Sequence, residues 1–164
     1  MKGGRNLFEW VQLSHLPDIV VMNIAAHLHD IGDMMDIVRR LGPILDSMRR
    51  MYTEARRPLS LAWRTSHSGH LDCADAIEPL KMPGNQPAAA RDKHGWRFHQ
   101  TFDAMAMNAS RHLNYTMLDM SPLILRPDAH SGRRYMGDCL HYCIPGPIDI
   151  FSVVLQQALF NKEL

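Results

Sequence analysis

The sequence predicts an α/β fold with a mainly parallel sheet. Short apolar runs, each bounded by turn residues, alternate with longer stretches whose apolar residues recur every three or four positions. The resulting order, strand, helix, strand, helix, strand, is typical of parallel sheets, because parallel neighbours need a crossover connection. With 164 residues and 46% hydrophobic content, the chain can bury a core as one domain over residues 1–164.

Charge and hydropathy argue against several classes of protein. The formal net charge of +1 gives no strong field, and the Arg-Arg pairs at 39–40, 49–50 and 56–57 fit the solvated face of a helix, so we expect no nucleic-acid partner. No apolar run reaches the roughly 18 to 20 residues that span a bilayer. We therefore expect no membrane segment in this chain.

The first predicted strand covers Ile19–Asn23, a short β-branched run typical of a buried strand in a parallel sheet. The loop that follows, residues 24–30, contains two histidines. Open α/β sheets bind their ligands at the carboxyl ends of the strands, so this loop is placed where a site would lie.

The next stretch predicts an amphipathic helix from Asp33 to about Arg56, with Asp33 as its N-cap. Gly42-Pro43 interrupts the stretch while the apolar periodicity continues. The pattern fits either one kinked helix or two short stacked helices.

The remaining elements follow from the same rules. Strands are predicted over 59–64 and 115–120, and helices over 96–112 and 147–159, with Pro147 in the first turn of the last helix. The stretch between residue 73 and about residue 95 contains several prolines and is predicted to be a surface loop.

Three cysteines leave one over in any pairing. Cys139 and Cys143 lie four residues apart around a turn and are poorly placed to pair with each other, whereas Cys73 could pair with either one. Three reduced thiols are the alternative. The glycosylation acceptor patterns at Asn108 and Asn114 favour the secretory route.

The stretch from Gly137 to Pro147 concentrates reactive side chains on a rigid backbone. It contains Asp138 and, three residues later, His141, followed by a Pro-Gly-Pro segment. An Asp-x-x-His turn can hold a carboxylate against one imidazole nitrogen, which fixes the tautomer and leaves the other nitrogen to act as a base. Asp138 and His141 are the candidate catalytic residues.

Several segments together resemble the C-terminal part of the trichome birefringence-like family, also called PC-esterase domains, which are polysaccharide O-acetyltransferases with a GDSL/SGNH-like fold. The resemblance is carried by Trp63-Arg64-Thr65 with His70 and Cys73, by Leu118–Pro122, by Leu125–His130 and by Asp138–Asp149. It implies a three-layer SGNH-hydrolase-like fold.

The resemblance also implies a Ser-His-Asp acyl-enzyme mechanism in which His141 is the general base and Asp138 orients it. The family's nucleophile lies in a Gly-Asp-Ser motif after a first strand, and this chain has no such motif. We therefore expect a domain that lacks its N-terminal strand and nucleophile segment, so that this chain alone is inactive. Asn23 falls where the family has an Asn-Thr-Gly-His segment and is a candidate oxyanion donor.

Further expectations rest on the same resemblance. Cys73 is expected to pair with Cys139, leaving Cys143 without a partner. Arg64, His67 and His70 either contact substrate or lie in a solvated loop, and the segment Arg126–His130 shapes its own loop by hydrogen bonding. We expect a polysaccharide substrate, an acetyl donor as co-substrate, no bound cofactor, no metal, and a Golgi or other secretory location.

Three alternatives are open at this point. The chain could belong to a carbohydrate acetylesterase, or to a non-catalytic polysaccharide-binding or scaffold protein with the same fold. It could also bind zinc through Cys73, Cys139, His141 and Cys143, although the two-residue intervals of the last three match no familiar zinc motif.

Overall fold

The computed structural model describes residues 16–25, 28–67, 69–71, 73–82, 92–131 and 137–161. Its centre is a three-stranded sheet in the order β1 (Ile19–Met22), β2 (Ser60–Arg64), β3 (Thr116–Leu118). Both neighbouring pairs are parallel, with Val20 opposite Leu61 and Trp63 opposite Met117. The predicted α/β class with a parallel sheet is confirmed.

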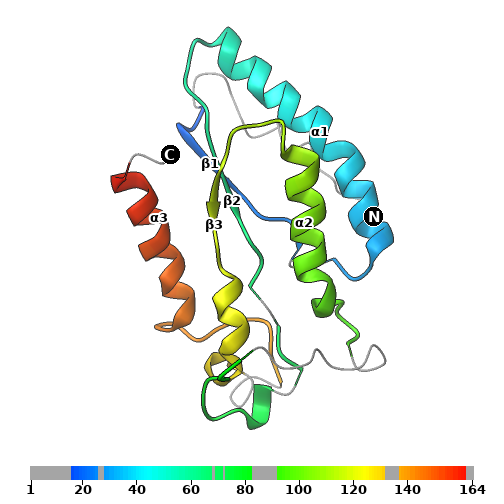
Figure 1. Ribbon diagram of the computed structural model, residues 1–164, viewed down its shortest axis with the longest axis vertical. Helices are drawn as coiled ribbons and strands as arrows, with labels where there is room; N and C mark the ends of the chain where they lie inside the picture. Colours follow the sequence, from blue (N-terminus) through cyan, green and yellow to red (C-terminus); the bar gives the residue numbers. More distant parts are fainter. Residues whose placement is uncertain are drawn as a thin grey trace.

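Helices cover both faces of this sheet (Figure 1). Helices α1 (Ile31–Glu54) and α2 (His99–Ser110) lie on one side of it, and α3 (Ile150–Phe160) lies on the other. The alternation along β2 explains the three layers, because Leu61 and Trp63 pack in the core formed with α1 and α2, whereas Ala62 packs against α3. Each face of β2 therefore contributes to a different core.

Helix α1 differs from its prediction at the start. Asp30, in extended backbone, is the N-cap, and its Oδ1 accepts a hydrogen bond of 2.9 Å from the Asp33 amide. The prediction of Asp33 as the cap was wrong, because Ile31 already belongs to the apolar face and the helix begins one turn earlier. Beyond Gly42, the helix runs through Pro43 without a break; Pro43 is exposed, and buried Leu41 and Leu45 hold the helix on either side.

The other elements are shorter than predicted because turns replace their ends. The predicted helix over 96–112 begins with the 3-10 turn Trp96–Phe98 before α2, and α3 is preceded by the 3-10 turn Pro147–Asp149. Strand β3 ends at Leu118, and the amide of Met120 then donates to Thr65 Oγ1 at 2.7 Å instead of joining the sheet.

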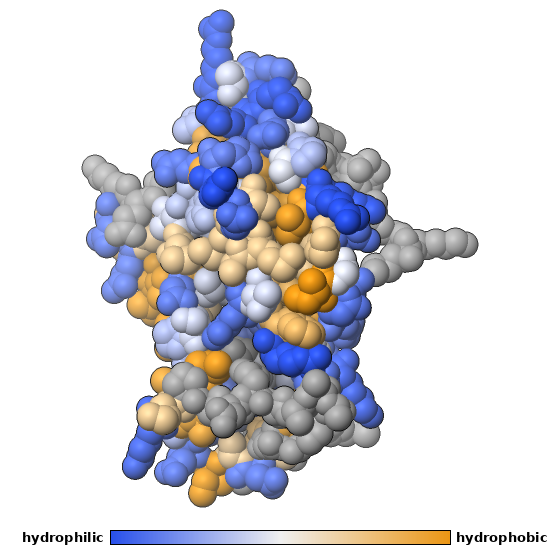
Figure 2. Space-filling model, turned by 45° about the vertical axis from the view of Figure 1, so that its right-hand side comes forward, coloured by the Kyte–Doolittle hydropathy of each residue, from blue (hydrophilic) through white to orange (hydrophobic). Residues whose placement is uncertain are grey.

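Part of the predicted surface loop, residues 83–91, and His27 of the first loop lie outside the described residues. None of the helices within the described ranges has the length and apolar character needed to cross a membrane. The side that carries α1 and α2 shows hydrophobic residues grouped at mid-height, with hydrophilic residues above them (Figure 2). Between β1 and α1 runs an apolar groove of about 370 Å³.

Candidate active site

The carboxyl ends of β2 and β3 point to the end of the molecule where the loops and 3-10 turns gather (Figure 1). Backbone hydrogen bonds join these loops across long sequence separations. The His70 amide donates to Cys139 O at 2.9 Å, and the Cys143 amide donates to Ala129 O at 2.9 Å. The turn predicted to be catalytic is therefore built into the edge of the sheet where α/β folds place their ligands.

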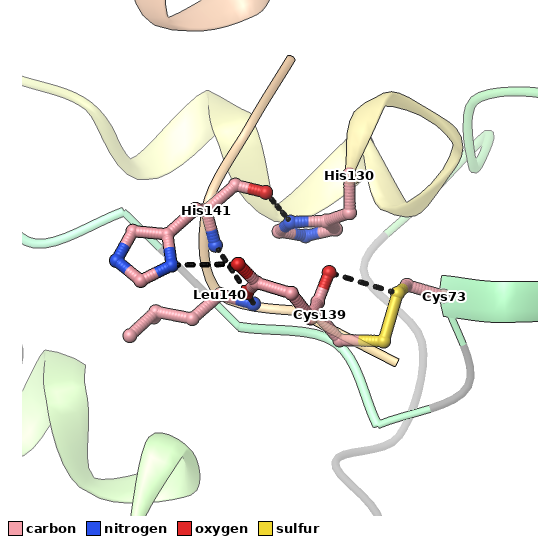
Figure 3. A network of polar contacts seen from close by, with 6 residues as sticks. Cys73, His130, Cys139, Leu140 and His141 are labelled. Atoms are coloured by element: carbon pink, nitrogen blue, oxygen red, sulfur yellow. Dashed lines mark hydrogen bonds and ion pairs between the residues drawn. A yellow bond between two sulfur atoms is a disulfide. The ribbon is translucent and has the colours of Figure 1, made fainter. Parts of the chain in front are cut away.

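Asp138 and His141 are in contact within this turn, and Figure 3 draws the hydrogen bonds that start from Leu140 and His141. His141 Nδ1 lies 2.8 Å from Asp138 Oδ2, and the other carboxylate oxygen accepts hydrogen bonds of 3.1 Å from the amides of Leu140 and His141. The backbone thus fixes the carboxylate independently of the imidazole. We call the segment 138–143 the catalytic turn, after the role that the sequence predicts for it.

The electrostatics of the turn keep the carboxylate charged. Burial raises the pKa of Asp138, but the hydrogen bonds from His141 and Leu140 together outweigh burial and hold that pKa below its ordinary value. An ionised Asp138 accepts from His141 Nδ1–H, so the lone pair of the ring lies on Nε2.

The ring of His141 is open to solvent. Its side chain is 67% exposed, and Nε2 makes no hydrogen bond to any residue within the described ranges. A histidine that is oriented by a carboxylate and presents a bare Nε2 at a surface can accept a proton from a hydroxyl group placed against it.

The structure contains the disulfide between Cys73 and Cys139, with the two Cα atoms 5.5 Å apart, and leaves Cys143 as an exposed free thiol. This is the expected pairing, and it selects Cys139 from the two partners that spacing alone left open. Because both cysteines are oxidised, neither supplies a thiolate for the zinc alternative. No cluster of three potential metal ligands occurs in the part of the chain that is described.

The disulfide lies in a small core of its own. Trp96 and Leu140 pack with the two cysteines, and Leu71 packs against this cluster. Gly69 allows the close approach of Trp96, because a Cβ at residue 69 would lie 2.2 Å from the indole. The β2 loop and the catalytic turn are therefore fixed to each other by covalent bonding and by packing.

Arg64 and His67 lie next to each other at the end of β2. Arg64 Nη1 is 3.3 Å from His67 Nδ1. Burial lowers the pKa of His67 to about 4, and the nearby Arg64 charge adds to this effect. Because guanidinium only donates, His67 accepts at Nδ1 and carries its proton at Nε2. Its ring meets the edge of Tyr142 of the catalytic turn, with centroids 5.7 Å apart.

Asn23 connects the ends of β1 and β2. Its Nδ2 donates to Arg64 O at 2.9 Å and to Ser66 Oγ at 3.0 Å, so both amide hydrogens are engaged within the fold. Ser66 in turn donates from its amide and its hydroxyl to Asp103 of α2. The oxyanion role of Asn23 stays a prediction, and the structure adds a connecting role to it.

Asp103 is a site residue that the sequence did not single out. It is buried, and burial raises its pKa while the hydrogen bonds from Ser66 and the charge of Arg64 oppose the rise. An acid one position after buried Phe102, on the apolar face of a predicted helix, was the available signal.

His70 and His130 were predicted to lie in separate loops, and the structure brings them together. His70 Nδ1 lies 2.7 Å from His130 Nε2. His130 Nδ1 lies 3.0 Å from the carbonyl oxygen of His141, a contact drawn in Figure 3. Arg126 donates two hydrogen bonds of 2.9 Å to the carboxylate of Asp128. This ion pair shapes the loop that contains both residues, as expected.

Residues 43–158 match the profile of the PC-esterase family, described as the GDSL/SGNH-like acyl-esterase family found in Pmr5 and Cas1p. Protein trichome birefringence-like 20 of Arabidopsis thaliana is 36% identical over 67 residues, which cover 35% of this chain and 14% of that relative. Xyloglucan O-acetyltransferase 2 of Populus trichocarpa is 35% identical over 60 residues, covering 28% of this chain and 14% of that relative. The matched part thus spans about a seventh of these relatives' length. No solved structure matches the chain.

Proposed function

This chain belongs to the PC-esterase family of GDSL/SGNH-like acyl-esterases. We propose that it supplies the catalytic aspartate and histidine of an O-acetyltransferase that moves acetyl groups to polysaccharide hydroxyls. The observation that carries the proposal is the 2.8 Å contact between Asp138 and His141, with the carboxylate fixed by two backbone amides and Nε2 exposed. This is the orienting half of a Ser-His-Asp triad.

In the proposed reaction, His141 Nε2 removes the proton from a serine hydroxyl as the serine Oγ attacks the acetyl carbonyl of the donor. The tetrahedral intermediate expels the donor's leaving group, which takes the proton from His141, and an acetyl-serine remains. His141 then removes the proton of a sugar hydroxyl, whose oxygen attacks the acetyl-serine, and the serine Oγ leaves with the proton that His141 returns. Asp138 stays ionised and stabilises the imidazolium in both steps.

The serine is proposed to come from a Gly-Asp-Ser segment outside this chain, since the chain contains no such motif. Transfer and hydrolysis share the acetyl-serine step and differ in whether a sugar hydroxyl or water reaches it. The exposure of His141 leaves room for either acceptor, so the acetylesterase reaction is the second candidate.

Arg64 and His67 are proposed to contact the substrate. They lie at the carboxyl end of β2, and His67 meets the Tyr142 ring of the catalytic turn. A neutral His67 has its proton on Nε2 and can donate to a sugar oxygen, whereas Arg64 provides positive charge for a developing oxyanion. The acetyl donor is a co-substrate of this site.

The disulfide fits an oxidising compartment, and we propose the secretory pathway, including the Golgi lumen, as the location. The curated relative from poplar is named for xyloglucan acetylation. A hemicellulose of this kind is accordingly the first substrate to test.

The test of function is an assay of acetyl release from an activated acetyl ester, and of acetyl transfer to xyloglucan oligosaccharides, with the protein extended by its upstream coding sequence. We expect activity that depends on a serine in an upstream Gly-Asp-Ser motif and that is abolished by His141→Ala. A matched control is His112→Ala, since His112 also contacts an aspartate but lies elsewhere. Full activity of His141→Ala, or an upstream sequence without that serine, would contradict the proposal.

A further inference from the structure

Two histidines of different loops connect the body of the protein to the catalytic turn. His70 Nε2 lies 2.7 Å from the carbonyl oxygen of Ile124, and His70 Nδ1 lies 2.7 Å from His130 Nε2. His130 Nδ1 lies 3.0 Å from the carbonyl oxygen of His141. Three hydrogen-bond contacts therefore run in series from one carbonyl to the other.

The partners in this series decide which ring nitrogens carry protons. A carbonyl oxygen only accepts, so the outer nitrogens, His70 Nε2 and His130 Nδ1, must each carry a proton. A neutral imidazole has a single N–H. If both rings were neutral, the two inner nitrogens would face each other at 2.7 Å with a lone pair each, which is repulsive.

We infer that His70 and His130 share one additional proton in this arrangement, as an imidazole–imidazolium pair, and that they are positioning residues which hold the catalytic turn through the carbonyl of His141. The inference of a shared proton depends only on the three hydrogen-bond contacts of these rings. Its consequence for catalysis rests on the proposed function of His141.

Loss of the shared proton has a structural consequence. One ring must then change its tautomer so that a single N–H lies between the inner nitrogens. If His130 changes, its Nδ1 lone pair faces the His141 carbonyl and that contact is lost; if His70 changes, the contact to Ile124 is lost. Either change loosens the link between the 3-10 turn Ser121–Leu125 and the catalytic turn.

Charged and titratable groups face the pair from each neighbouring element. The loop after β2 contributes His67, the 3-10 turn Pro127–Ala129 contributes Asp128 with its partner Arg126, and the catalytic turn contributes Asp138 and Tyr142, whose ring stacks on His130. Asp128 favours the proton on both rings, and Asp138 favours it on His130.

Burial opposes the proton. It lowers the pKa of His70, and it lowers the pKa of His130 to about 4, with the His70 charge adding to the second effect. The pair is therefore charged on the acidic side of the ordinary histidine pKa of 6.5 and releases its proton as the pH rises. Because the two rings interact directly, one uptake belongs to the pair.

The experiment is a nuclear magnetic resonance titration of the full chain with ¹⁵N-labelled histidine, from acidic to neutral pH. We expect His70 and His130 to take up one proton together, with His130 protonated at Nδ1 in the charged form. The Cys143 amide donates to Ala129 O beside this pair. Its protection factor, which is the intrinsic exchange rate at each pH divided by the observed rate, should be about tenfold higher in the charged form, since one hydrogen bond is at stake.

The matched variant is His70→Asn. The asparagine amide replaces Nδ1 and can donate to a neutral His130 Nε2, so the His130 contact to His141 should persist without an extra proton and the shared uptake should vanish. His112→Asn, on the surface between α1 and α2, should leave the uptake unchanged. If His70→Asn does not fold, the titration of the unsubstituted chain still decides.

Two results would overturn the inference: independent titration of the two rings, or neutral rings that keep protons on His70 Nε2 and His130 Nδ1 at the same time. The readout needs no serine and no substrate. If the chain shows the coupled uptake while the protein extended by an upstream Gly-Asp-Ser segment transfers no acetyl group, the proposed function is contradicted and the shared proton is supported.

Discussion

The described part of the chain contains two aspartate–histidine pairs of the same chemistry in different settings. Asp138 and His141 lie three residues apart, and two backbone amides hold the carboxylate. Asp46 of α1 and His112, which follows α2, approach within 3.2 Å, with both side chains nearly half exposed. Within the described residues, no backbone amide donates to Asp46. A short contact distance therefore does not by itself define a catalytic site. The backbone amides that hold the carboxylate in place distinguish the Asp138–His141 pair.

The largest expected difference between the pairs is in activity. In the extended protein, His141→Ala should lower kcat by about 10⁴- to 10⁶-fold, because the general base of the triad is lost. His112→Ala should change kcat less than twofold. Steady-state acetyl release measures both, and equal losses in the two variants would show that the pairs do not differ as argued.

Asp138→Asn should lower kcat by about 10³- to 10⁴-fold, since the amide no longer stabilises the imidazolium and can favour the wrong tautomer. The matched change, Asp46→Asn, should leave kcat unaltered. Urea denaturation of both variants separates this loss of activity from a folding defect. A folded Asp138→Asn variant with unreduced kcat would argue against the orienting role.

The disulfide that joins Cys73 to Cys139 of the catalytic turn should contribute about 4 kcal/mol to the free energy of unfolding. This is the loop-closure value for a separation of 66 residues. The double change Cys73→Ser with Cys139→Ser should lower the free energy of unfolding by about this amount in urea titrations. Cys143→Ser is the control and should have almost no effect, because its thiol is exposed and unpaired. A large loss in the control would point to a different pairing.

Acid should weaken the turn through Asp138. The hydrogen bonds hold the pKa of Asp138 below 3.8, its ordinary value. A depressed folded pKa contributes stability that is complete above the unfolded pKa and is lost as the pH falls through the folded pKa. The difference in unfolding free energy between the unsubstituted chain and Asp138→Asn should therefore be constant above about pH 5 and shrink toward pH 2. A difference that grows in acid would reverse this assignment.

The smallest effect is expected from the surface pair. Replacing Asp46 or His112 should change the free energy of unfolding by less than about 1 kcal/mol, since solvent screens an exposed pair and ordering two side chains opposes it. A double-mutant cycle with urea denaturation measures the coupling directly. A coupling above 2 kcal/mol would place this pair among the structural supports of the fold.

The sequence was sufficient wherever the deciding interactions are local. Periodicity in the stretch that forms α1 and the β-branched run that forms β1 predicted the α/β class, and the spacing of Asp138 and His141 predicted their contact, because three residues of one turn keep two side chains within reach. The start of α1 was predicted one turn late, since an N-cap depends on backbone conformation at Asp30 that several nearby acids could adopt.

Tertiary structure decided what depends on residues far apart in the chain. His70 and His130 meet across 60 positions, and Ser66 meets Asp103 across 37. Composition and periodicity do not predict such contacts, because the crossover connections and the packing of the sheet bring the two residues together. The contact within the catalytic turn could thus be predicted from its own residues, and the Cys73–Cys139 pairing from the family resemblance, whereas the histidine pair became visible only in the folded chain.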